Sequence, residues 1–159
     1  MAIIKPNNNT ISAITALPAA ITTGKVLQSV FSKTTTVVNV TATTWTDVLS
    51  LNITPSSTSS KILVLASCGG LKRYGGDTEL QLRVTRDGSS IAQIKGMNDG
   101  TSDFLSADGT PINQLDTPSS TSALTYKIQM NNRDATGTCQ ICGNNADTSL
   151  NLLEIAGWL

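Results

Sequence analysis

The chain has 159 residues, the length of one ordinary domain with enough residues for a hydrophobic core. Eleven basic residues balance eleven acidic ones, so no net charge favours nucleic acid or a membrane surface as a partner. The sequence contains no histidine, which excludes Ser-His-Asp and Cys-His catalytic relays and every histidine metal ligand. Only 14% of the residues are charged, and a surface of this kind can be buried against another subunit.

Residues 1–23 differ from the rest of the chain and are predicted to form an extended N-terminal arm. An Asn run follows Pro6 where a signal peptide would have its apolar region, so no signal peptide is expected. The segment follows neither a helical nor a strand period, yet it is too apolar for a solvated tail. We expect it to bind a partner chain, with a frayed terminus as the alternative. Its large aliphatic residues are Ile3, Ile4, Ile11, Ile14, Leu17 and Ile21.

Residues 24–159 are predicted to form one β-sandwich domain, because short strands follow one another at the ~8–12-residue spacing of a sandwich or barrel. The predicted strands are residues 25–32, 37–41, 45–54, 61–66, 79–86, 90–95, 123–130, 138–142 and 149–155. No window holds a useful helical period, and no apolar run approaches the ~18 residues of a membrane helix. The expected fold is an antiparallel, jelly-roll-like sandwich of eight or nine strands in two sheets.

One six-residue segment, Thr-Pro-Ser-Ser-Thr-Ser, occurs twice, at residues 54–59 and 117–122. Proline fixes the backbone and the hydroxyls cap it locally, so each copy is predicted to be a turn. Each copy opens directly into a predicted strand, which indicates a sheet protein with paired halves. The strand after the first copy is apolar on both faces, and we expect it to be central and covered on both sides.

The three cysteines are an odd number, which argues against a disulfide framework. Cys139 and Cys142 have the spacing of half a redox or zinc site. In an extended strand, however, residues three apart point to opposite faces and lie ~10 Å apart, beyond the ~7 Å limit for a disulfide. Together with Cys68 they are expected to be buried or free thiols.

Two further stretches are candidate ligand sites. Oxygen-bearing residues between Asp99 and Asp108 have a spacing that suits a calcium loop, but the bidentate Glu of an EF-hand is missing and Asp-Gly is foremost a turn signal. Lys72, Arg73 and Tyr74 precede two glycines and could face a sugar or a phosphate, with a solvated turn as the favoured alternative. Residues 96–117 are expected to be irregular, with several glycines and Pro111 as breakers.

No catalytic motif accompanies these stretches. The sequence has no GxSxG motif, no P-loop and no GxGxxG before a helix, and most of its acids lie in turns or at outward strand positions. The sequence alone does not exclude a glycosidase that uses a pair of carboxylates. The expectation is a protein that is not an enzyme and that needs no metal and no cofactor.

Residues 21–28, 53–64 and 116–128, together with the leader around Asn7, resemble small virion structural proteins of tailed bacteriophages. The resemblance runs nearly end to end, although residues 156–159 extend beyond the expected last strand. It implies a component of the virion without enzymatic activity and without nucleic-acid or membrane partners. Two roles remain open. One is a homotrimeric capsid decoration (cement) protein that the arm ties to the major capsid protein, and the other is a tail-fibre or baseplate tip that binds a host glycan. The small number of aromatic residues disfavours the second role.

Overall fold

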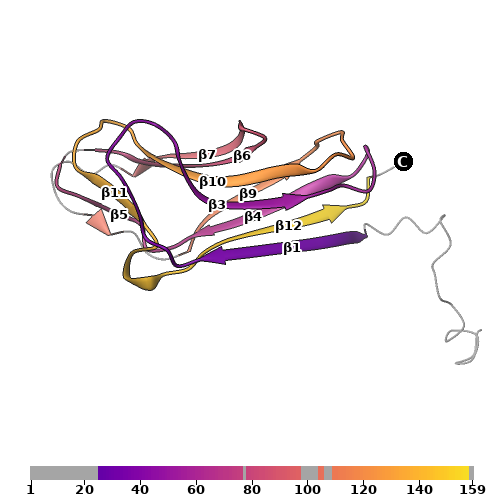
Figure 1. Cartoon of the computed structure of the whole chain (residues 1–159), viewed down its shortest axis with the longest axis horizontal. Coiled ribbons are helices and arrows are strands. Elements are labelled where there is room, and N and C mark those ends of the chain that lie inside the picture. The colour runs from indigo at the N-terminus through magenta and orange to yellow at the C-terminus, as the bar shows by residue number, and fades with distance from the viewer. Residues whose placement is uncertain (1–24, 77, 98–103, 106–108, 158–159) are drawn as a thin grey trace, which may run out of the picture.

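The computed structural model describes residues 25–76, 78–97, 104–105 and 109–157. Twelve strands make up nearly all of the regular structure in this part of the chain (Figure 1). In chain order they are β1 (Val26–Thr34), β2 (Val38–Val40), β3 (Thr46–Ile53), β4 (Lys61–Cys68), β5 (Lys72–Tyr74), β6 (Leu80–Arg86), β7 (Ser89–Met97), β8 (Phe104–Leu105), β9 (Thr110–Asp116), β10 (Leu124–Asn132), β11 (Thr138–Ile141) and β12 (Thr148–Ile155). A single 3₁₀ turn, Gly143–Asn145, precedes β12, and no described helix is long and apolar enough to cross a membrane.

The strands form three antiparallel sheets of four strands each, in the orders β1-β12-β4-β9, β3-β10-β6-β7 and β2-β11-β5-β8. Each strand of the third sheet is the chain neighbour of one strand in the second, in the same order, so the third sheet extends the second beyond an irregular stretch. Two backbone hydrogen bonds cross this stretch, from Asn132 to Ala42 and from Arg133 to Glu79. The molecule is therefore a sandwich of eight long strands, four of which are interrupted.

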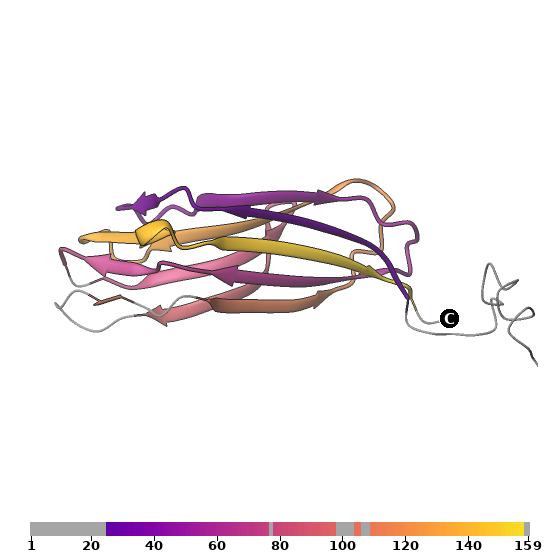
Figure 2. The same cartoon turned by 90° about the horizontal axis from the view of Figure 1, so that it is seen from below.

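Counted as eight strands, the order is 1-8-3-6 in one sheet and 2-7-4-5 in the other, which is the jelly-roll arrangement. The all-β, jelly-roll-like sandwich predicted from the sequence is confirmed. Figure 2, seen from below, shows the long strands running lengthwise along the molecule. β12 finishes at one end of the sandwich. The start of β1 lies at this end too, because the amide of Ala156 donates to the carbonyl oxygen of Lys25 at 2.9 Å.

All nine predicted strands are present, and three strands were missed. The prediction that residues 96–117 are irregular is wrong for β9, which pairs with β4 over its whole length. Pro111 lies at the beginning of β9, and β9 is an edge strand, where a missing amide hydrogen costs no ladder bond. The other missed strands are the short β5 and β8, which pair with each other.

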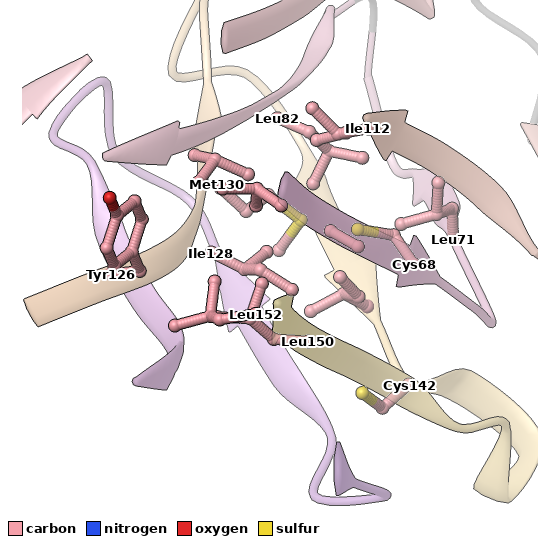
Figure 3. Close-up of a cluster of buried hydrophobic side chains, with 14 of the residues drawn as sticks. Cys68, Leu71, Leu82, Ile112, Tyr126, Ile128, Met130, Cys142, Leu150 and Leu152 are labelled. Atoms are coloured by element: carbon pink, nitrogen blue, oxygen red, sulfur yellow. The ribbon is translucent and has the colours of Figure 1, made fainter. Parts of the chain in front are cut away.

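The core lies between the sheets and consists of the inward side chains of both (Figure 3). β10 alternates as predicted, with Tyr126, Ile128 and Met130 fully buried. Against them pack Leu150 and Leu152 of β12. A fully buried aliphatic side chain contributes ~1.5–3 kcal/mol, so this alternation is what holds the two sheets together.

All three cysteines are buried and free, as predicted. Cys139 lies in β11, whereas Cys142 follows that strand in a left-handed conformation with φ of 60°. Burial raises the pKa of the Cys68 thiol to about 12 and that of Cys139 to about 11, so both are protonated at neutral pH. These thiols are part of the core.

Candidate functional site

The outer face of sheet β1-β12-β4-β9 carries several large apolar side chains in two neighbouring rows. In the registers of β4, Leu63 lies opposite Leu153 of β12 on one side and opposite Leu115 of β9 on the other. Leu65 lies in the next outward row, whose β1 member is Phe31. Phe31 is 60% exposed, Leu115 49% and Leu65 36%. We call these five residues, Phe31, Leu63, Leu65, Leu115 and Leu153, the outer apolar face.

This arrangement corrects one expectation. The strand after the first Thr-Pro-Ser-Ser-Thr-Ser copy is central, as predicted, but within the single chain it is covered on its inner side only. Ile62, Val64 and Ala66 point into the core, while Leu63 is half-buried and Leu65 exposed. The doubly apolar pattern was therefore a signal for an outward surface that one sandwich does not cover.

The outward positions of the four strands carry no acidic residue, because Glu154 of β12 and Asp116 of β9 are buried on the inner side. The outward positions around the outer apolar face are neutral polar residues such as Ser29, Asn113 and Asn151. Cations lie only at its ends, where Lys33 pairs with Asp147 at 2.8 Å and Lys61 begins β4. A partner that binds here would bury apolar surface without desolvating a carboxylate, which is the composition expected of the centre of a protein interface.

The outer face of the other sheet, β3-β10-β6-β7, has the opposite character. Asp47 accepts hydrogen bonds from Lys127 and from Gln129, both at 2.5 Å, and Gln129 in turn accepts one from Arg83 at 2.7 Å. The Arg83 guanidinium lies 4.2 Å from the ring centroid of Trp45. The bonds from Gln129 and Lys127 hold the pKa of Asp47 below its usual value. This face is a polar surface that carries an ion pair.

The two Thr-Pro-Ser-Ser-Thr-Ser segments lie at one end of the sandwich, the end where β1 begins and β12 finishes. Both connect the two sheets, the first from β3 to β4 and the second from β9 to β10. Each enters a strand that lies between two neighbours in its sheet, which agrees with the predicted pairing of halves. A buried carboxylate, Glu154 or Asp116, lies at the base of each segment.

Glu154 is fully buried beside the first segment. The amide and the hydroxyl of Ser56 donate to its Oε1 at 2.7 and 2.6 Å, and Gln28 Nε2 donates to its Oε2 at 2.6 Å. Burial alone raises the pKa of this carboxyl, but the groups around it, Ser56, Ser60 and Gln28, outweigh that effect and lower the pKa to about 2. Glu154 is therefore an ionised structural anchor for the loop.

The residues predicted to form sites are placed as follows. The arm residues Ile3, Ile4, Ile11, Ile14, Leu17 and Ile21, and the possible calcium ligands between 99 and 103 and at 108, lie outside the described residues. Within the described part of the chain, no group of three or more Cys, Asp and Glu side chains is arranged to hold a metal ion.

The possible ligand loop of Lys72, Arg73 and Tyr74 is strand β5, so its interpretation as a solvated turn is wrong. Arg73 is fully buried and donates to the carbonyl oxygen of Gly76 at 2.8 Å. Lys72 lies 4.9 Å from the ring centroid of Tyr74, which makes a cation–π contact within the strand. Arg73 therefore serves the fold and is not presented to a ligand.

Comparison with known proteins places no family on this chain. No family model matches it, and no curated protein does. Among solved structures, the VP2 subviral particle of infectious bursal disease virus matches 83% of this chain and 34% of its own, at 12% identity and a TM-score of 0.44. The T13 particle of the same virus matches 89% and 42%, at 14% identity and a TM-score of 0.40. The chain thus spans less than half the length of each of these proteins.

Proposed function

We propose that this protein is a non-enzymatic structural component of a tailed-bacteriophage virion, a homotrimeric capsid decoration (cement) protein. In this proposal the N-terminal arm binds the major capsid protein or another virion component. The sequence resemblance suggests the class of particle, and the physical features of the chain suggest the role.

The observation that carries the proposal is the outer apolar face. A jelly-roll sandwich that leaves Phe31, Leu65 and Leu115 exposed on one sheet, and ion pairs on the other, has one surface suited to contact and one suited to water. Exposed apolar patches of this kind mark sites of protein association. Lys25 lies at the end of the same sheet, and residues 1–23, which precede it in the sequence, contain six large aliphatic residues. A protein with two association surfaces can contact its own copies and a particle at the same time.

The test is binding to particles from which this protein has been stripped. Full-length protein should co-sediment with the stripped particles, and a variant that lacks residues 1–23 should stay in the supernatant while keeping the circular dichroism of a folded β protein. Each apolar arm residue that is fully buried contributes ~1.5–3 kcal/mol, so the loss should be complete at micromolar concentration. Equal sedimentation of the two proteins would refute the anchoring role.

Copy number separates the head from the tail. A decoration protein should be present in hundreds of copies per virion, measured by quantitative mass spectrometry against the major capsid protein. A handful of copies would instead favour the tail-fibre or baseplate role and would overturn the assignment to the shell.

A further inference from the structure

The outer apolar face needs a cover, and the chain contains a segment of matching chemistry. We propose that the outer apolar face binds the N-terminal arm of a neighbouring copy, through residues 11–21 of that arm. Successive arms would then hold the homotrimer together, an inference that rests on the trimer of the proposed function. It assigns the apolar face, which the sequence did not identify as a site, to a specific segment of a second chain.

The chemistry of the two surfaces matches. The face presents leucine and phenylalanine side chains among neutral polar residues, while the two acids of its four strands, Glu154 and Asp116, are buried on the inward side. Residues 11–21 contain Ile11, Ile14, Leu17 and Ile21 and no charged residue. Contact between them buries aliphatic side chains against aliphatic side chains and leaves no carboxylate without a partner. The ion-paired outer face of the other sheet, with Asp47, Lys127 and Arg83, offers the arm no comparable surface.

The length of the arm is sufficient. The hydrogen bond from Ala156 to Lys25 continues the β1–β12 ladder to the end of the sheet, so the arm starts at that end. Residues 22–25 link Ile21 to β1 and can span up to ~14 Å, and residues 11–21 can extend over up to ~35 Å along the face. Four strands spaced ~4.8 Å apart form a face only ~15 Å wide. A neighbour whose sheet end adjoins this one therefore lies within reach.

A neighbouring copy is favoured over the same chain by direction and by symmetry. β1 enters the sheet from Lys25 along the strand axis, so an arm that covered its own face would have to reverse beside the sheet end. The arm and the face are also two different surfaces, and a contact between different surfaces is head-to-tail and can close into a ring of three. A contact between two identical faces would instead give a two-fold dimer.

The arm divides into two parts that a truncation series can separate. Ile3 and Ile4 lie before Pro6 and the Asn run, whereas the other four aliphatic residues follow it. A variant that lacks residues 1–10 should keep the oligomeric mass of the full chain in native mass spectrometry. A variant that lacks residues 1–23 should be monomeric at micromolar concentration, and an unchanged oligomer in this variant would overturn the inference.

The same series distinguishes this inference from the proposed function. If the variant that lacks residues 1–10 keeps its oligomer and loses particle binding, the inference and the anchoring role both stand. The first part of the arm then binds the particle. If the variant that lacks residues 1–23 is monomeric and still binds particles, the arm contact between copies stands and the anchoring role fails. If it stays oligomeric and no longer binds particles, anchoring stands and the inference fails.

Cross-linking tests the contact directly. The native thiols are buried, so surface cysteines can be linked selectively with a short bis-maleimide. A mixture of two single variants, Ile14→Cys and Leu115→Cys, should give a product of twice the chain mass that contains one of each. The double variant should give covalent products up to three chains. Cross-linked products of single-chain mass alone would show that the arm binds its own chain and would overturn the assignment to a neighbour.

A charge on the face should break the contact while the sandwich stays folded. Leu65→Glu places a carboxylate on the outer apolar face, on the inner strand β4, at a position already 36% exposed. Gln93→Glu is the matched control, since Gln93 is exposed and lies opposite Arg83 on the other outer face. Leu65→Glu should raise the dissociation constant of the oligomer at least tenfold, and Gln93→Glu should leave this constant unchanged. If Leu65→Glu unfolds the protein, Leu115→Glu on the edge strand β9 repeats the test. Wild-type assembly in a folded Leu65→Glu or Leu115→Glu variant would contradict the inference.

Discussion

The two Thr-Pro-Ser-Ser-Thr-Ser segments have one sequence and two different structural roles. In the first, Ser56 donates from both its amide and its hydroxyl to the buried carboxylate of Glu154. In the second, the matching residue Ser119 has a φ of 51°, and its hydroxyl has no hydrogen-bond partner among the described residues. The six-residue sequence is thus sufficient for a turn. Whether its serine is hydrogen-bonded to the body of the protein depends on the residue that the neighbouring strand places beside it.

The second segment is held instead by the residue that precedes it. Asp116, the last residue of β9, accepts hydrogen bonds from Arg86 at 2.6 Å and from the hydroxyl of Tyr126 at 2.6 Å. Tyr126 is fully buried, and burial together with Asp116 raises its pKa, so the phenol stays a donor at every ordinary pH. Thus the first segment is fixed by an acid from β12, and the second by the acid that precedes it.

The largest effect is expected at the base of the second segment. Asp116→Ala leaves Arg86 and the Tyr126 hydroxyl without their acceptor, and removing one partner of a largely buried ion pair costs ~3–4 kcal/mol. The free energy of unfolding in urea measures this loss. Asp147→Ala is the control, because the Lys33–Asp147 pair is about half exposed and should be worth less than ~1 kcal/mol. Similar losses in the two variants would contradict the buried role of Asp116.

Acid should weaken the first segment. The pKa of Glu154 is depressed to about 2 in the folded protein, below the ~4.3 of an unfolded chain. The contribution of Glu154 to the free energy of unfolding is therefore complete above pH ~5. It is lost as the pH falls through ~2, and the loss is on the order of 2–3 kcal/mol. Urea unfolding at several pH values from 6 to 2 measures how the free energy of unfolding depends on pH. The Glu154→Gln variant should show a weaker dependence. If the Glu154→Gln variant keeps the wild-type pH dependence, Glu154 is not the cause of that dependence.

The matched serines give the sharpest comparison. Ser56→Ala removes one hydrogen bond to an ionised carboxylate and should cost ~1–2 kcal/mol, whereas Ser119→Ala should change the free energy of unfolding by less than ~0.5 kcal/mol. Both substitutions exchange serine for alanine at the same position of an identical segment. Equal effects would mean that the bond from Ser56 to Glu154 adds nothing to the stability of the turn.

The smallest effect has the opposite sign. Ser119 occupies a left-handed conformation that glycine adopts without a steric cost, so Ser119→Gly should stabilise the protein by ~0.5 kcal/mol. Ser120→Gly is the control, because Ser120 Oγ accepts a hydrogen bond from the amide of Ser122 at 3.0 Å and its loss should destabilise. A fall in thermal unfolding temperature for Ser119→Gly would contradict the backbone argument.

Much of the fold was predictable because its signals are local. The alternation of Leu80, Leu82 and Val84 marks β6, and the Asp87-Gly88 pair, with φ of 48° and 85°, forms the predicted turn into β7. β9 was missed because Pro111 and its polar residues resemble a loop, and only pairing with β4 makes it a strand. The environment of Arg73 was missed for the same reason, since its burial depends on segments distant in the sequence.

Local sequence patterns predicted the antiparallel strands, the positions of nine of them, the inward side chains of β10 and the free thiols. Period-two patterns, turn residues and cysteine spacing depend on residues close together in the chain, so the sequence reveals them without knowledge of strand pairing. The row of Leu63, Leu153 and Leu115, and the contact between Ser56 and Glu154, could not be predicted in this way. Strand register joins residues far apart in the chain, and the surface that awaits a partner exists only once that register is set.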